Sequence, residues 1–187
     1  MTTSVQLYLL LLAAVGVERL VELVLSTRNA RRVRSRGGLE VGQRHYGFMV
    51  VLHTLFLISC FVEVVALGRS PIRGVSALAL GFIVLSMALR YWAISSLGDR
   101  WNTRVLVEPG APAVRRGPYR FFRHPNYVAV VLEILALPLV HGAWATALLF
   151  SIANATLLKV RIDVEETALR EHCDYDGVFG AGLPGQR

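Results

Sequence analysis

The stretch Arg120–Tyr127, RFFRHPNY, places basic and aromatic residues directly before an apolar run. Pro125 suits the first position of a helix, because its missing N–H would have no partner there. The helix would then present free N–H groups and the positive end of its dipole beside Arg123 and His124, an arrangement that binds anions. The alternative is an ordinary helix start with aromatic and arginine side chains at a membrane surface.

A second group of polar residues, KVRIDVEETAL, follows the last apolar run at positions 159–169. Arg161 and Glu165 are four residues apart and share one helical face, and Glu166 is adjacent. The alternative is a solvated helix with one stabilising pair. A helical hairpin between the two groups would bring them together. The pattern therefore indicates a site for a zwitterionic cofactor.

The composition indicates what must hold these residues in place. The chain has 187 residues, of which 54% are hydrophobic and 18% charged, which predicts one membrane domain. We expect an all-α integral membrane protein with about five transmembrane segments, the last two forming a hairpin that turns at Pro138 and Gly142. The predicted parts are transmembrane helices at 5–25, 47–67 and 75–97, a cytoplasmic cofactor loop at 98–126, the helical hairpin at 127–160, and a cytoplasmic tail at 161–187 that completes the site.

Arginines supply nineteen of the twenty basic residues and lie mainly in the first and third loops. The positive-inside rule then places the N-terminus outside and the C-terminus in the cytoplasm, in a multi-pass protein of the cell inner (plasma) membrane whose site faces the cytoplasm. The net charge of +7 fits an anionic lipid surface and does not indicate nucleic acid. Cys60 and Cys173 form no CxxC motif, so no metal is expected. The first apolar run lacks the marks of a signal peptide and is interpreted as a retained helix.

Charged residues inside apolar segments need partners or a cavity. Glu18, Arg19 and Glu22 fit either an internal ion pair or the wall of a polar pocket. A lone histidine in an apolar helix, such as His53, is more often a hydrogen-bonded core residue than a ligand. Glu133 either faces the same cavity as His124 or caps a neighbouring helix.

The order GPYRFFRHPNY, apolar hairpin, RIDVEETAL resembles the isoprenylcysteine carboxyl methyltransferase family, integral membrane enzymes that use S-adenosylmethionine. A wider superfamily with phospholipid methyltransferases and sterol reductases has a similar C-terminal core. The N-terminal stretch ERLVELVLSTRNARRVRSRGGLEVGQRHY is similar to bacterial members, some of which O-methylate long-chain alkylpyrones or alkylresorcinols.

The resemblance implies a set of site residues. Arg161 would face a lipophilic methyl acceptor, with Glu133 as a further substrate residue. A carboxylate acceptor needs no base, whereas a phenol or enol needs one, for which Glu166 or Glu133 is a candidate. The implied cofactor contacts are Ala111, Pro112, Ala113, Val114, Tyr119, His124, Pro125, Asn126, Tyr127 and Glu165.

The closure of the site and the function of the protein both leave alternatives open. After Leu169 the chain departs from the family pattern, with Tyr175 as its one tyrosine, so the closure of the site is not predicted. The alternative functions are an NADPH-dependent membrane reductase and a membrane scaffold that binds lipid without catalysis.

Overall fold

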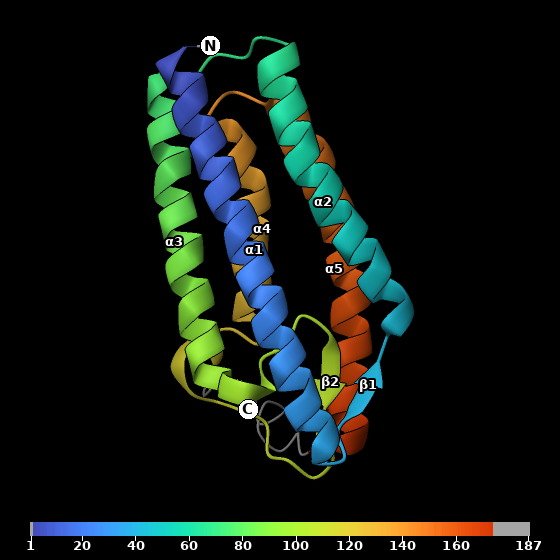
Figure 1. Cartoon of the computed structure of the whole chain (residues 1–187). Helices are drawn as coiled ribbons and strands as arrows, with labels where there is room; N and C mark the ends of the chain where they lie inside the picture. The colour runs from blue at the N-terminus through green and yellow to red at the C-terminus, as the bar shows by residue number, and fades with distance from the viewer. Residues whose placement is uncertain (1, 174–187) are drawn as a thin grey trace, which may run out of the picture.

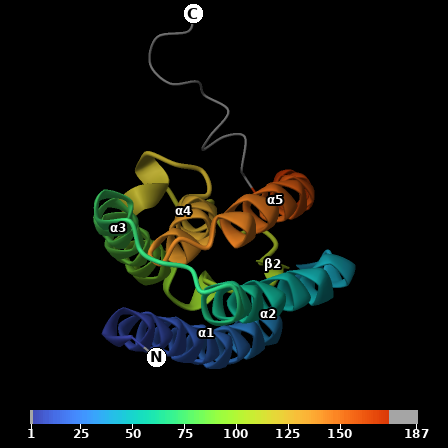
Figure 2. The same cartoon turned by 90° about the horizontal axis from the view of Figure 1, so that it is seen from above.

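The computed structural model describes residues 2–173 and shows an elongated bundle of five long helices with a small sheet at one end (Figure 1). We call that end the sheet end. Viewed along the bundle, α4 lies between α3 and α5, and α2 lies between α1 and α5 (Figure 2). The long helices are α1 (Thr3–Ser35), α2 (Gln43–Ala66), α3 (Arg73–Leu97), α4 (Pro125–Leu139) and α5 (Trp144–His172).

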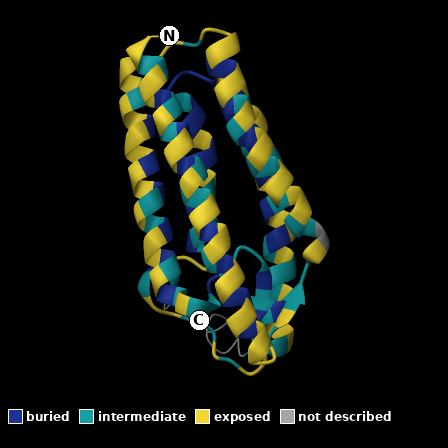
Figure 3. Cartoon of the chain, in the orientation of Figure 1, coloured by how far each residue is buried: buried dark blue, intermediate teal, exposed yellow. Residues whose placement is uncertain are grey.

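Among the described residues, the helices α2, α3 and α5 are long and apolar enough to cross a membrane. At 1.5 Å per residue, the fifteen residues of α4 extend about 22 Å, less than the roughly 30 Å of a bilayer core. Exposed leucine, isoleucine, valine and phenylalanine side chains cover much of the outer helix surfaces (Figure 3). Such surfaces suit lipid rather than water, and the chain is a membrane protein.

The predicted hairpin is present as α4 and α5, but its details differ from the prediction. Pro138 lies inside α4, and the turn itself spans residues 140–143. Gly142 has φ 73°, and a Cβ there would lie 2.7 Å from the Ser70 carbonyl oxygen, so the turn requires glycine. The second arm continues to His172, beyond the predicted end at 160. One continuous helix therefore carries both the apolar arm and the polar residues that follow it.

The sheet end contains strands that the all-α prediction lacks. Strand β1 (Leu39–Val41) pairs antiparallel with β2 (Val105–Val107), in the register Leu39 to Val107. Two 3₁₀ helices, η1 (Gly98–Arg100) and η2 (Gly117–Arg120), complete the predicted loop. Glu40 receives hydrogen bonds from Arg34 and Arg104, which ties β1 to α1 and to the start of β2. Three-residue strands are too short to show a period of two in the sequence.

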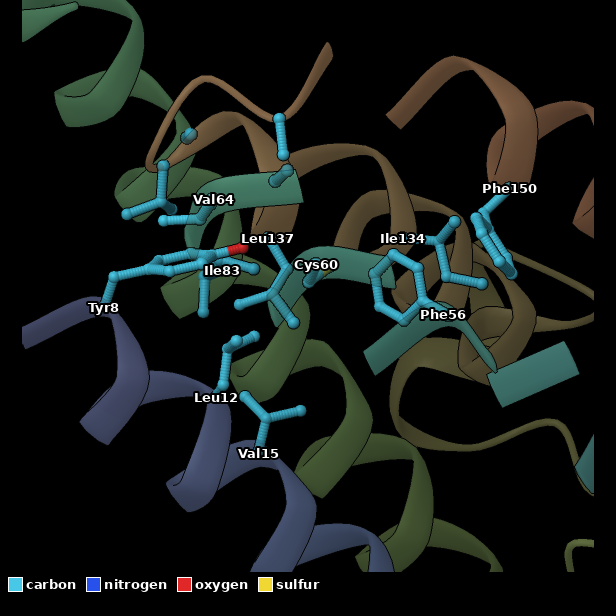
Figure 4. Close-up of a cluster of buried hydrophobic side chains, with 14 residues drawn as sticks. Tyr8, Leu12, Val15, Phe56, Cys60, Val64, Ile83, Ile134, Leu137 and Phe150 are labelled. Carbon is cyan, nitrogen blue, oxygen red and sulfur yellow. The ribbon is translucent and has the colours of Figure 1, made fainter. Parts of the chain in front are cut away.

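A hydrophobic core fills the half of the bundle remote from the sheet (Figure 4). Lipid tails are as apolar as these side chains, so close packing rather than escape from water holds the helices together here. The core draws on all five helices, through Tyr8, Leu12, Val15, Phe56, Cys60, Val64, Ile83, Ile134, Leu137 and Phe150.

Nearer the sheet end, three helices are joined by ion pairs. We call these five residues of α1, α3 and α4 the ion cluster: Glu18, Arg19, Glu22, Arg90 and Glu133. Arg19 Nη1 lies 2.7 Å from Glu22 Oε2, and Arg90 Nη1 lies 2.6 Å from Glu133 Oε2. Arg19 Nη2 also lies 3.6 Å from Glu133, which links the two pairs. Of the two interpretations of Glu18–Glu22, the structure supports the internal ion pair.

Candidate functional site

A cavity of about 160 Å³, partly open to solvent and lined by both polar and apolar groups, lies at the sheet end. Its walls come from the loops on either side of β2, from β2 itself, from the start of α4 and from α5. Pro125 begins α4 and is buried, but it does not line the cavity. The lining includes these sequence-predicted residues: Ala111, Pro112, Ala113, Val114, Tyr119, His124, Asn126, Tyr127, Arg161 and Glu165.

A chain of hydrogen bonds joins α4 to α5 inside this cavity. Arg161 Nε donates to the Tyr127 hydroxyl oxygen at 2.8 Å. The Tyr127 hydroxyl in turn donates to Glu165 Oε2. Arg161 and Glu165 share one face of α5, as the sequence predicted, and Tyr127 lies between them. These two hydrogen bonds hold the Arg161 guanidinium and the Glu165 carboxylate on opposite sides of the Tyr127 hydroxyl.

Arg161 extends from the cavity wall towards α2. Its side chain is almost fully buried, with 5% relative exposure. Nη2 donates to the Thr103 carbonyl oxygen, whereas Nη1 lies 3.3 Å from the Met49 sulfur on α2. A thioether is a weak acceptor for a guanidinium. The Nη1 group therefore keeps most of its capacity to bind a stronger acceptor on the α2 side.

His124 stands immediately before α4 and is held by a carboxylate. Its Nε2 lies 3.2 Å from Glu166 Oε1, and its ring stacks on Tyr127 with centroids 5.3 Å apart. Glu166 also accepts from Arg170 at 2.6 Å. Unlike Glu165, Glu166 does not line the cavity. Its contacts make it a positioning group for His124.

Two polar groups of the lining are suited to a polar ligand. Burial, and then the nearby charge of Glu165, raise the pKa of Tyr119, so its hydroxyl keeps its proton and remains a donor. The Asn126 Oδ1 atom is buried in the first turn of α4 and has no hydrogen-bond partner among the described residues. Buried polar atoms are normally paired, so this oxygen indicates that a bound ligand donates a hydrogen bond to it at the start of α4.

Sequence reasoning missed one wall of the cavity, which β2 and the segment before it form. Ser26 of α1 donates to Asn102 Oδ1 at 2.7 Å, and Asn29 Nδ2 donates to the Trp101 carbonyl oxygen at 2.8 Å. The available signal was the three-residue spacing of Ser26 and Asn29, which places both on one face of α1. Glu133 lies in the ion cluster, outside the lining. The part of the predicted tail beyond Cys173, which contains Tyr175, falls outside the described residues.

The fold and this cavity define a class: a helical membrane protein with a partly polar cavity at one end of the bundle. The family model described as "Isoprenylcysteine carboxyl methyltransferase (ICMT) family" matches residues 79–171, and the chain belongs to this family of membrane methyltransferases. The matched segment contains α4, most of α5 and the loop that carries the predicted site. The resemblance seen in the sequence is thus confirmed.

Individual relatives extend the likeness over most of the chain. The chain is 41% identical over 167 residues to the uncharacterized protein YpbQ of Bacillus subtilis (strain 168), covering 89% of this chain and 98% of that protein. It is 25% identical to an uncharacterized protein of Haemophilus influenzae, over 81% of this chain and 88% of the other. It is 30% identical to Protein-S-isoprenylcysteine O-methyltransferase of Tribolium castaneum, over 63% of this chain and 44% of that protein.

Proposed function

We propose that the protein is an S-adenosylmethionine-dependent O-methyltransferase that acts on a lipophilic acceptor. The observation that carries the proposal is the hydrogen-bond chain Arg161–Tyr127–Glu165, in which both end residues line the cavity and Arg161 also reaches towards α2. The family and the named relative from Tribolium castaneum support the same chemistry.

The cavity residues fit the charges of S-adenosylmethionine, which carries a carboxylate, an ammonium and a sulfonium. Glu165 offers an anion to a cationic group. His124 and the start of α4 suit a carboxylate. Tyr119 offers a donor and Asn126 an unused acceptor, and the segment 111–114 forms an apolar wall. When bound, the cofactor supplies a methyl group on a positively charged sulfur.

The chain's own residues would act mainly by positioning. Fixing both reactants in line can supply several kcal/mol of the barrier, on the order of 7–11 kcal/mol in favourable cases. Arg161 would bind the acceptor oxygen through Nη1, because Nε and Nη2 already have partners. The Arg161 side chain is almost fully buried, and its low exposure to water strengthens these contacts.

The acceptor would reach the site from the bilayer, because Arg161 faces α2 rather than solvent. An isoprenylcysteine-like carboxylate is one candidate class. A long-chain alkylpyrone or alkylresorcinol hydroxyl is the other, and neighbouring genes for a type III polyketide synthase would favour it. Glu133 and Glu166, the sequence-predicted candidates for a substrate residue or a base, both lie outside the cavity lining.

For the topology, we propose the five-segment arrangement with the N-terminus outside and the site facing the cytoplasm at the plasma membrane. The loop at 98–126 and α5 beyond residue 160 would then form the cytoplasmic site. Arginines near the sheet end support this orientation, because basic residues favour the cytoplasmic side.

The test is calorimetric titration of detergent-purified protein with S-adenosylhomocysteine and, separately, with NADPH. We expect S-adenosylhomocysteine to bind and NADPH not to bind. His124→Ala and Glu165→Gln should weaken the binding at least tenfold. Glu171→Gln is the matched control, because this carboxylate is on the same helix but 64% exposed. Binding of NADPH alone would instead identify a reductase, and binding of neither a scaffold.

A further inference from the structure

The imidazole of His53 lies on the inner face of α2, and one of its nitrogens has no hydrogen-bond partner within residues 2–173. Met49, His53, Phe56 and Cys60 recur at helical spacing, and Phe56 and Cys60 belong to the core. His53 Nδ1 lies 2.9 Å from the Met49 carbonyl oxygen. A carbonyl oxygen only accepts, so Nδ1 carries the hydrogen and Nε2 keeps an unshared electron pair.

His53 does not line the cavity, but Met49 links it to Arg161 at the acceptor end of the proposed site. Met49 contacts both residues in question: its carbonyl accepts from His53, and its sulfur touches Arg161 Nη1. Along α2, His53 lies about one helical turn, or 5.4 Å, further from the sheet end than Met49 does. It therefore lies on the membrane side of Arg161, where a lipophilic acceptor would lie.

Charged groups from each of the three other helices around His53 act on the imidazole. They are the Glu133 carboxylate of α4 and the guanidinium groups of Arg19 of α1 and Arg161 of α5. A proton on His53 would be attracted by Glu133 and repelled by the two arginines. The ion cluster holds three carboxylates against two guanidinium groups, so it offers a partner to a protonated imidazole.

We propose that His53 Nε2 accepts the proton of a hydroxyl acceptor bound by Arg161. The proposal rests on the proposed function and narrows its acceptor to a hydroxyl compound. The acceptor O–H bond breaks as the N–H bond forms at Nε2, and the oxygen electron pair forms the new bond to the methyl carbon. The sulfonium sulfur keeps the electron pair of the broken S–C bond and becomes neutral. The positive charge thus moves to the imidazole and from there to solvent as a proton.

A structural histidine bonded to its own helix is the competing explanation, and His53→Asn separates the two. Asparagine can keep an N–H donor towards the Met49 carbonyl but has no basic nitrogen. Thr54→Val is the matched control, because Thr54 also donates to a carbonyl four residues earlier, at 2.8 Å, but its side chain is exposed on the outer face.

The kinetic probes are 5-pentadecylresorcinol and a ring-fluorinated analogue with a more acidic hydroxyl. We expect His53→Asn to lower kcat/KM about 100-fold or more with the first probe. The loss should shrink to a few-fold with the second, because an already ionised oxygen needs no base. In the unsubstituted protein the rate should fall at acid pH as His53 is protonated, and His53→Asn should lack that fall. Equal activity of His53→Asn and the wild type on both probes would overturn the proposal.

A second readout needs no turnover. In ¹⁵N NMR of the protein with S-adenosylhomocysteine, the resonance removed by His53→Asn should be that of a neutral Nδ1–H imidazole. Its Nε2 signal should move when the resorcinol is added. An Nε2–H tautomer would overturn the proposal. If S-adenosylhomocysteine does not bind at all, the proposed function fails as well. If it binds and carboxylic acids but no phenols are methylated, only the assignment of His53 fails.

Discussion

Arg90 of α3 and Glu133 of α4 form an ion pair of 2.6 Å inside the bundle, with 1% and 4% of their side chains exposed. Glu133 is eight residues from the start of α4, about 12 Å beyond it at 1.5 Å per residue. The pair therefore lies beyond the cavity on the membrane side. The pair joins α3 to α4, which are connected along the sequence only by the long segment 98–124.

Breaking this pair should destabilise the fold and leave cofactor binding intact. Removing one partner of a buried ion pair costs about 3–5 kcal/mol. We expect the stability cost of Glu133→Gln to be near the lower end of this range, because Glu22 still approaches Arg90 to 3.7 Å. Unfolding monitored by circular dichroism in detergent measures the change. The double variant Arg90→Met with Glu133→Leu should lose less free energy of unfolding than the two single variants lose in sum. A stable Glu133→Gln protein with a raised KM for its acceptor would instead assign Glu133 to substrate binding.

Tyr127→Phe should weaken binding of S-adenosylhomocysteine about tenfold. The change leaves the buried Arg161 Nε donor and one Glu165 oxygen without their shared partner, a cost of about 1–3 kcal/mol. Isothermal titration calorimetry measures the affinity. Tyr46→Phe is the control, because it keeps the ring that Arg104 covers at 4.1 Å. Unchanged affinity in Tyr127→Phe would mean that the hydroxyl does not order the site.

Glu63→Gln should lower stability by about 1–2 kcal/mol without altering cofactor affinity. The carboxylate accepts from the backbone N–H groups of Ala145 and Thr146, at 3.2 and 2.7 Å, and so caps α5 from α2. Arg69→Gln separates this cap from the ion pair at 3.0 Å. Because Arg69 is partly exposed, its loss should cost less than 1 kcal/mol. Equal losses in the two variants would assign the stabilisation to the ion pair.

The sheet end should loosen at acid pH through Glu40. Burial opposes ionisation of this carboxyl, but the hydrogen bonds from Arg104 and Arg34 outweigh it and hold the pKa below the ordinary value of 4.5. A group with a lowered folded pKa contributes stability above the unfolded pKa and loses it as pH falls through the folded one. The protection of the β1–β2 amides against hydrogen exchange, taken relative to the intrinsic exchange rate at each pH, should therefore be steady down to about pH 4.5 and decrease below it. Glu40→Gln should remove that acid-dependent step, and a step that persists would point to another group.

The sequence predicted those features that depend on neighbouring residues. The apolar runs predicted the helices, and Pro125 predicted where α4 begins, because its missing N–H suits only the first turn. The four-residue spacing of Arg161 and Glu165 predicted that both would line one cavity.

Features that depend on distant partners were not predictable in this way. Leu39–Val41 is too short to be recognised as a strand before its partner at Val105–Val107 is known. Glu165 and Glu166 are chemically alike, and only the rotation of about 100° per residue decides that one lines the cavity and the other contacts His124. Similarly, the charge of Glu133 was recognised as unusual, but its partner Arg90 is on another helix.

The pairing of β1 with β2 imposes an order on biosynthesis. The residues of β1 are synthesised before α2 and α3, and they gain their partner only when Val105–Val107 has been translated. Arg161 and Glu165 emerge later still, on the last helix. A nascent chain arrested before Trp144 can insert its first membrane helices but lacks two of the groups that close the hydrogen-bond chain. The hydrogen-bond chain of the proposed site is therefore completed only after the four preceding long helices have been synthesised.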